Sequence, residues 1–122
     1  MTTPPHVAWK GQLWAPKAYW LLTQVQHNNQ CNGCGAAGAA LDFVPDTMYG
    51  LSVTQCCNIH DYMYGTGKTE KARYEADTSF LVNCLRLIEA KGGWLMMPRC
   101  YRAVTYYLAV RKKGGAAFAR RK

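Results

Sequence analysis

Two adjacent cysteines stand inside a helix-compatible stretch, "QCCNIHDYMYG", residues 55–65. Successive side chains on a helix point roughly 100° apart, so Cys56 and Cys57 diverge and face different neighbours. Disulfides from both residues would pin this helix to the rest of the chain. No other feature of the sequence constrains the fold as strongly.

The chain has six cysteines in 122 residues. An even number suits three disulfides formed in an oxidising compartment, so we expect a secreted protein. Six cysteines allow 15 pairings, and the cysteine count does not choose among them. A hydrophobic content of 49% in a chain of this length predicts one domain, residues 1–122, with a modest core.

The formal net charge of +8 is concentrated at one end of the chain. Residues 91–122 hold nine Lys or Arg and no acid, whereas residues 1–90 hold six Lys or Arg and all seven acids. A one-sided basic field favours anionic partners, and charge alone does not separate membranes from nucleic acids. The alternative is that "RKKGGAAFARRK" forms a solvated, partly disordered tail.

The periodicity of apolar residues predicts a mostly α-helical fold with little strand. Residues 1–30 form an N-terminal segment with a helix, residues 31–46 a glycine-rich loop, residues 52–90 a helix pair, and residues 91–122 a basic helix and tail. The expected helices run from Lys17 to about Asn28, from Ser52 as a cap to about Tyr64, from Thr69 to Ala90, and from Pro98 to about Lys112.

Helix spacing places the polar residues of the opening stretch on defined faces. Cys56, His60 and Tyr64 are each four residues apart and share one face. The short "GTGKT" connection makes the two helices of the pair antiparallel. His60 then lies roughly 6 Å before the turn and Asp77 roughly 10 Å after it, so that a His–Asp pair across the hairpin is feasible.

The residue types at these positions suit acid–base chemistry beside a cation. A histidine takes a proton from water near neutral pH, and a carboxylate such as Asp77 on its other ring nitrogen fixes the tautomer. Asp61 points to another side of the helix and is available to a hard cation. Because Ca²⁺ prefers six to eight oxygens, the loop "CNGCGAAG" would have to supply carbonyl groups.

The ordered set "NGCG", "VPD", "QCCNIHDYMY", "TGK" and "EADTSFLVNCL" resembles secreted, calcium-dependent phospholipases A2, and most closely the group XII branch. The resemblance covers about residues 31–88. It implies a disulfide-stapled phospholipase A2-like fold, with two antiparallel core helices and an N-terminal calcium loop. It also implies calcium-dependent hydrolysis of the sn-2 ester of glycerophospholipids, with a phospholipid membrane surface, expected to be anionic, as the substrate.

The resemblance assigns a role to each matching position. His60 matches the general base and Asp77 the carboxylate that orients it, while Tyr64 matches a tyrosine that hydrogen-bonds this carboxylate. Asp61 matches the calcium-binding carboxylate. The loop carbonyls that complete the Ca²⁺ site match Gly33, Gly35 and Ala37, and the Gly35 N–H matches an oxyanion donor.

The resemblance also implies a disulfide framework. The implied pairs are Cys34 with Cys57, Cys56 with Cys84, and Cys31 with Cys100. One family bridge is missing, because Met63 and Ala76 stand where both of its cysteines would be. Replacement of that bridge by an apolar contact is expected.

Other interpretations compete with a lipolytic enzyme. One alternative is a zinc site, with ligands drawn from Cys31, Cys34, Cys56, Cys57 and His60. That interpretation leaves Asp61 and Asp77 without a role. "YGTGKTEKAR" lacks the first glycine of a phosphate-binding loop, and we expect neither nucleotide nor nucleic acid as a partner. His60 alone would often be a buried structural histidine, and a non-catalytic basic protein that binds a membrane or a receptor is the second functional hypothesis.

The stretch "GGWLMMP", residues 92–98, has two interpretations. The first interpretation is insertion into a lipid interface, with Arg99, Arg102 and the basic tail meeting the anionic headgroups. The inserting residues would be Trp94, Leu95, Met96 and Met97. An apolar cluster at the start of a helix is equally typical of core packing.

Overall fold

The computed structural model describes residues 9–10, 13–31, 33–35, 41 and 43–120. Its strands are β1 (Trp9–Lys10), β2 (Leu13–Trp14), β3 (Thr47–Met48) and β4 (Leu51–Ser52). Its helices are α1 (Lys17–Trp20), α2 (Gln24–Gln30), α3 (Thr54–Thr66), α4 (Glu70–Lys91) and α5 (Met96–Arg120). The prediction of a mostly helical fold is confirmed.

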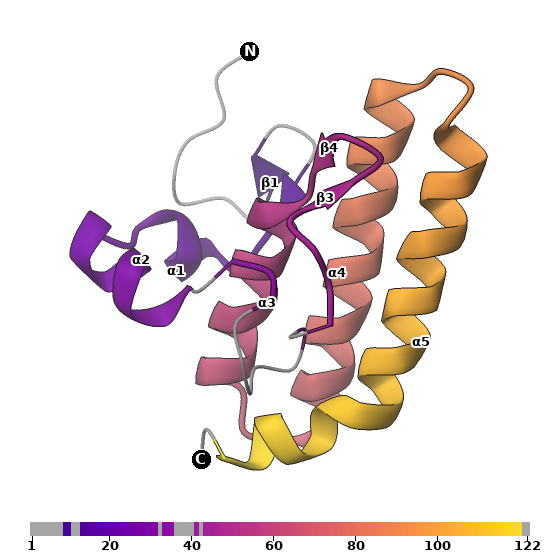
Figure 1. Ribbon diagram of the computed structural model, residues 1–122. Helices are drawn as coiled ribbons and strands as arrows, with labels where there is room; N and C mark the ends of the chain where they lie inside the picture. Colours follow the sequence, from indigo (N-terminus) through magenta and orange to yellow (C-terminus); the bar gives the residue numbers. More distant parts are fainter. Residues whose placement is uncertain (1–8, 11–12, 32, 36–40, 42, 121–122) are drawn as a thin grey trace.

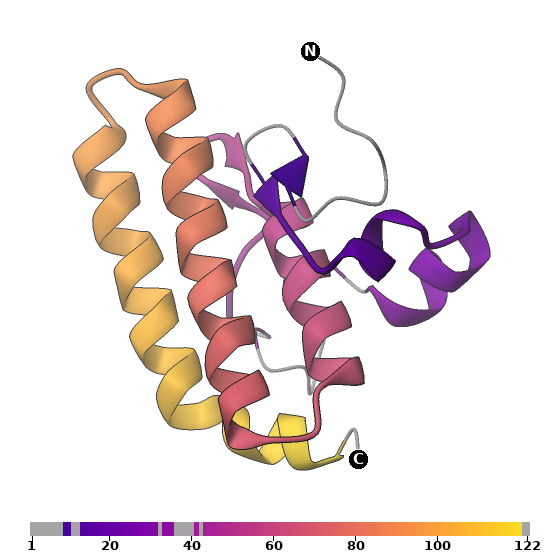
Figure 2. The ribbon, with the colours of Figure 1, turned by 180° about the vertical axis from the view of Figure 1, so that it is seen from behind.

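Three long helices make up the body of the molecule. Figure 1 shows α3, α4 and α5 side by side, each running opposite to the one before it, and Figure 2 shows the same order from behind. The antiparallel pair α3 and α4 was expected, but the close packing of α5 along α4 was not. The strands form two antiparallel pairs, β1 with β2 and β3 with β4.

Local signals set the ends of the central pair. Thr69 caps α4, since its side chain accepts a hydrogen bond from the Ala72 N–H, and Gly92 ends this helix with a φ of 61°. The expected cap at Ser52 is wrong, because Ser52 is paired with Thr47 in the β3–β4 hairpin and α3 begins only at Thr54. Because Ser52 is paired in strand β4, it does not also cap the helix.

The N-terminal helical segment is divided, although one helix was predicted from Lys17 to Asn28. Thr23 begins a new helix through a capping box, in which its side chain and that of Gln26 each bind the other's backbone N–H. The chain therefore leaves helical geometry between α1 and α2. A Thr-x-x-Gln pattern was present in the sequence and would have predicted this boundary.

The C-terminal basic segment is helical rather than a solvated tail. α5 continues past Lys112 to Arg120, and Figures 1 and 2 show its last turns bending beneath α3. Gly114 is buried against Tyr64, and the ring centroid of Phe118 lies 5.2 Å from that of Tyr64. These contacts with the core order a segment whose composition alone suggested disorder.

Among the described residues, the hydrophobic core has two clusters. One joins α3, α4, α5 and the β3–β4 hairpin, and the other joins α1, α3, the first part of α4 and the end of α5. Met63 and Ala76 are both buried in the second cluster. Met63 and Ala76 thus contribute to apolar packing, as expected for the two positions where the resemblance implies that a disulfide is missing.

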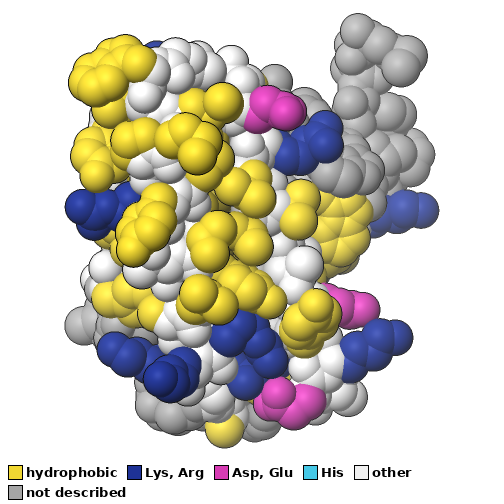
Figure 3. Space-filling view, turned by 90° about the vertical axis from the view of Figure 1, so that its right-hand side faces the viewer, with side chains coloured by type: hydrophobic (Ala, Val, Ile, Leu, Met, Phe, Trp, Pro, Cys, Tyr) yellow, Lys and Arg dark blue, Asp and Glu magenta, His cyan; other side chains and the backbone are white. Residues whose placement is uncertain are grey.

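Large apolar side chains also lie on the surface. Trp94, Met96 and Met97 are exposed, so the core interpretation of this stretch is wrong for them, while Leu95 is half-buried. Arg99, expected to meet lipid headgroups, is buried and donates to the Met48 carbonyl instead. Figure 3 shows hydrophobic side chains gathered on the face of the molecule where α5 lies. Within the described ranges, no helix combines the length and apolar character needed to cross a membrane.

Candidate functional site

A histidine and an aspartate meet between the two central helices. His60 of α3 and Asp77 of α4 are both fully buried, and His60 Nε2 lies 2.7 Å from Asp77 Oδ1. Tyr64, one turn after His60, donates its hydroxyl to the same oxygen at 2.8 Å. The structure therefore brings together the three residues that sequence spacing and the resemblance had grouped.

The second oxygen of Asp77 faces two arginines. Arg111 of α5 donates from Nη1 to Oδ2 at 2.6 Å, and Arg73 Nη1 lies 3.7 Å from this oxygen. Burial by itself favours the neutral acid, but the hydrogen bonds from His60, Tyr64 and Arg111 outweigh it and hold the pKa of Asp77 below its ordinary value of 3.8. Asp77 is therefore ionised at neutral pH and only accepts hydrogen bonds.

The ionised Asp77 determines the tautomer of His60. Since Asp77 Oδ1 can only accept, Nε2 must donate, and neutral His60 carries its proton there. The other ring nitrogen, Nδ1, is then unprotonated and basic. It is buried and has no hydrogen-bond partner among the residues that the structure describes. A buried basic nitrogen of this kind is able to accept a proton from a reacting molecule.

Tyr64 is held as a donor at this site. Burial, followed by the charge of Asp77, raises the pKa of the Tyr64 phenol. Its ring stacks at a tilt of 35° on that of His60, with 4.2 Å between centroids. The edge-on ring of Phe80 packs against His60 at 5.9 Å. Two rings and one carboxylate thus fix the orientation of the imidazole.

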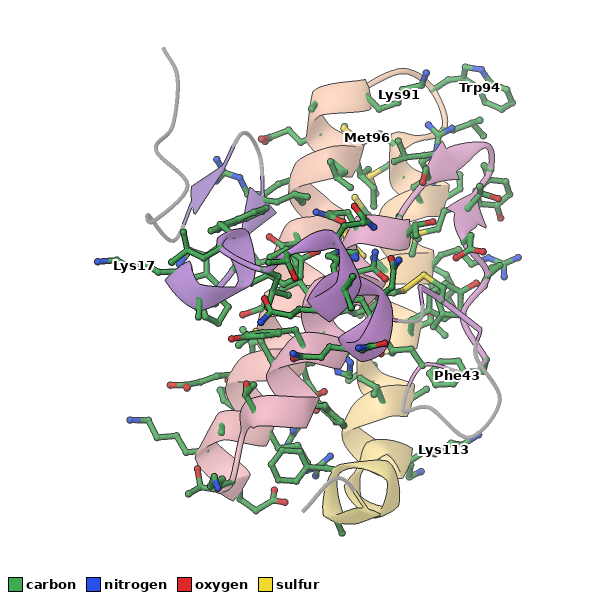
Figure 4. The ribbon with its side chains drawn as sticks, turned by 90° about the vertical axis from the view of Figure 1, so that its left-hand side faces the viewer. Lys17, Phe43, Lys91, Trp94, Met96 and Lys113 are labelled. Carbon is green, nitrogen blue, oxygen red and sulfur yellow. A yellow bond between two sulfur atoms is a disulfide. The ribbon has the colours of Figure 1, made fainter. Side chains whose placement is uncertain are left out.

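The glycine-rich loop lies across α3 near this site. The Gly33 N–H donates to Asn58 Oδ1 at 2.7 Å, and the Cys34 N–H donates to Asp46 Oδ1 at 3.0 Å. A disulfide between Cys34 and Cys57, visible as a yellow bond in Figure 4, ties the loop to α3. The first of the three implied cysteine pairs is therefore confirmed.

Three of the four expected cation ligands, Asp61, Gly33 and Gly35, are among the described residues. Asp61 is buried on α3 and is three residues after Asn58, so that it shares the helix face over which Gly33 lies. Gly33 and Gly35 have φ values of 67° and 81°, a left-handed geometry that glycine adopts readily. The Gly35 N–H, expected at an oxyanion, instead donates to the Leu41 carbonyl at 3.2 Å. Ala37 lies outside the described residues.

The other two implied disulfides are absent from the structure. Cys56 and Cys84 are buried together, and their hydrogen bond, followed by burial, raises the pKa of the Cys84 thiol, but the two sulfurs are not bonded. Cys31 belongs to the cluster between α1 and α3, whereas Cys100 packs against the other cluster. The Cys31–Cys100 pair is wrong because different parts of the core separate the two residues.

The structure argues against the zinc site considered from the sequence. The Cys34–Cys57 disulfide removes two of the five side chains that it required. In the part of the chain that the structure describes, no three His, Cys, Asp or Glu residues come close enough to hold a metal ion by themselves. A cation site at Asp61 would therefore have to depend on backbone carbonyls.

Four residues that position the site were missed from sequence: Asp46, Asn58, Arg73 and Arg111. Arg73 could have been found, because it precedes Asp77 by four residues and so shares its helix face. Arg111 is 34 residues from Asp77 and had no local signal.

A surface groove with a volume of about 520 Å³ lies along one side of α4. It is lined by Trp14, Tyr74, Glu75, Thr78, Ser79 and Val82. Neither His60 nor Asp77 lines this groove, although Thr78, the residue after Asp77, does.

Comparison of the chain with protein-family models, with curated proteins and with solved structures finds no match. The function is therefore inferred from the geometry of the site.

Proposed function

We propose that this protein is a secreted, calcium-dependent esterase of the phospholipase A2 type, which hydrolyses the sn-2 ester of glycerophospholipids. The proposal includes the phospholipase A2-like arrangement of the α3–α4 pair and the preceding loop. One observation carries it: Nδ1 of His60 is basic and without a partner among the described residues, while Asp77 holds Nε2.

His60 would act as a general base. Nδ1 takes a proton from a water molecule as that water attacks the ester carbonyl, and the resulting imidazolium is stabilised by the Asp77 carboxylate on Nε2. The same nitrogen then returns the proton to the departing alkoxide, which yields a fatty acid and a lysophospholipid. Tyr64 and Arg111 keep Asp77 ionised and in place throughout.

The residues beside this pair fit a Ca²⁺ ion. The buried Asp61 carboxylate and the carbonyl groups of Gly33 and Gly35 would hold it, because the disulfide and Asn58 fix Gly33 and Cys34 against α3. The third expected carbonyl, that of Ala37, lies outside the described residues. When bound, the ion would polarise the ester carbonyl and offset the negative charge that develops on its oxygen.

The complete burial of His60 favours a second candidate. In the described arrangement a substrate reaches Nδ1 only after the groups that cover it move. A protein that never makes this movement would use the network of His60, Asp77 and Arg111 only to join three helices. Such a protein would be a non-catalytic, membrane- or receptor-binding relative of the enzyme.

Fatty-acid release from phospholipid vesicles distinguishes the two candidates. We expect release with Ca²⁺, loss of release with a chelator, and a decrease of about 10²–10⁴-fold in the His60→Gln variant. The control is His27→Gln, a histidine of α2 that hydrogen-bonds Tyr19 and lies outside the site; its activity should stay within about twofold of wild type.

Release that is insensitive to both chelation and His60→Gln would refute the mechanism. A folded wild-type protein that binds vesicles but releases no fatty acid under any condition would establish the non-catalytic alternative. Circular dichroism of each variant verifies that it is folded.

A further inference from the structure

Five large apolar side chains form a stripe along the outside of α5 and the turn before it. They are Trp94, Met97, Tyr101, Val104 and Leu108, which are 87%, 73%, 76%, 41% and 59% exposed. The four members within α5 follow one another at intervals of four, three and four residues, a spacing that keeps side chains on one helix face, and Trp94 lies in the turn just before the helix. Figure 3 shows that hydrophobic side chains are numerous on the face where α5 lies.

The stripe is not part of the core. The opposite face of α5 is buried, and it presents Ala103 and Val110 to the hydrophobic core cluster and Arg99 to the carbonyls of Met48 and Tyr49. The inner face of α5 is thus buried in the core, whereas its outer apolar face remains in contact with water. A contiguous exposed apolar surface of this kind marks an interaction site.

Charges beside the stripe are positive. Arg102 and Lys112 are exposed on α5, and Lys91 lies at the end of the molecule from which Trp94 projects, as Figure 4 shows. The segment 91–122 contains no acid. Acidic side chains lie on the neighbouring helix α4. Glu70 forms an ion pair with Arg73, and Glu75 and Glu89 are exposed.

This combination favours an anionic bilayer over a second copy of the chain. Two copies that met through their α5 stripes would bring the cations of two acid-free segments together. A lipid surface instead accepts the apolar side chains below its headgroups, holds Trp and Tyr at headgroup level, and attracts Lys and Arg to its phosphates. We propose that the outer face of α5 docks the protein on an anionic phospholipid surface.

The docking face extends the proposed function, since the bilayer that it binds is also the proposed substrate. Binding does not require turnover, however, because the stripe shares no residue with the His60–Asp77 pair. The two proposals can therefore fail separately.

Vesicle sedimentation in chelator, with the His60→Gln variant as the background, measures binding without hydrolysis. We expect that background to partition strongly onto vesicles with a large anionic phospholipid fraction, weakly onto neutral phosphatidylcholine, and less as salt increases. Adding Tyr101→Ser and Leu108→Ser should lower the partition coefficient about tenfold or more. The matched control adds Leu21→Ser and Val25→Ser, two exposed apolar residues near α1 and α2, and should change it less than about twofold.

Equal losses in the two double variants, or equal binding to neutral and anionic vesicles, would overturn the docking face. The proposal also fails if the stripe substitutions leave vesicle binding unchanged but convert a dimer into a monomer in analytical ultracentrifugation, since the occupant is then a second copy. Hydrolysis of a monomeric short-chain phospholipid tests the active site independently. It should be unaffected by the stripe substitutions and lost in His60→Gln.

Discussion

Replacement of Gly114 by alanine tests whether α5 really docks on the candidate site. A Cβ at this position would lie 2.5 Å from Tyr64 Oη and 3.2 Å from Val110 Cγ2. The first distance is too short for any real contact, so either the helix or Tyr64 must move. Displacement of Tyr64 would break its hydrogen bond to Asp77.

The neighbouring glycine provides a control that isolates this effect. A Cβ at Gly115 would approach nothing closer than Arg73 Cζ at 4.0 Å, which is an ordinary contact. Both substitutions gain about 1 kcal/mol of helix propensity, and this gain cancels when the two variants are compared. If the helix moves, overpacking costs about 1–3 kcal/mol. If Tyr64 moves instead, loss of its hydrogen bond to the charged Asp77 costs about 1.5–3 kcal/mol. Gly114→Ala should therefore be less stable than Gly115→Ala by about 1–3 kcal/mol.

Urea unfolding of both variants, with the disulfide intact and followed by circular dichroism, gives the two free energies of unfolding. We expect Gly115→Ala to be as stable as the wild type or slightly more stable, and Gly114→Ala to be less stable. If the two differ by less than about 0.5 kcal/mol, Gly114 does not pack on Tyr64, and the continuation of α5 beneath α3 is wrong.

Two further predictions concern Asp77. Arg111→Gln removes the hydrogen-bond donor to Asp77 Oδ2 and should lower the free energy of unfolding by about 1–3 kcal/mol. The control Lys112→Gln, on the exposed side of the same turn, should change it by less than about 0.5 kcal/mol. Equal effects of the two substitutions in urea unfolding would contradict the ion pair. Because the folded pKa of Asp77 is below its ordinary value of 3.8, the stability that its charge contributes is fully present above that value and is lost as the pH falls through the folded pKa. The free energies of unfolding of the wild type and Asp77→Asn should therefore differ most near neutral pH and converge in acid, and a difference independent of pH would refute this origin.

Part of the site could be predicted because it depends on local geometry. The 3.6-residue period of a helix places His60 and Tyr64 on one face whatever surrounds them, and a short connection to α4 brings Asp77 opposite. Thr69 and Gly92 likewise specify the ends of α4 through groups within one turn of the chain.

The remaining features depend on contacts between distant segments. Arg111 reaches Asp77 only because α5 packs along α4, and no local pattern encodes a contact over 34 residues. The basic segment after Lys112 is polar enough to appear disordered, yet it is helical because Phe118 and Gly114 meet Tyr64.

The sequence by itself thus determined the helical class and the His60–Asp77–Tyr64 group, since helix period, capping and chain connectivity act over short distances. The Cys34–Cys57 disulfide was expected only from the resemblance. Only the tertiary structure decided which cysteines lie apart, which cations surround Asp77, and that the outer face of α5 remains exposed. Those outcomes depend on how the two core clusters divide the apolar side chains, and α1, α3, α4 and α5 all contribute to that division at once.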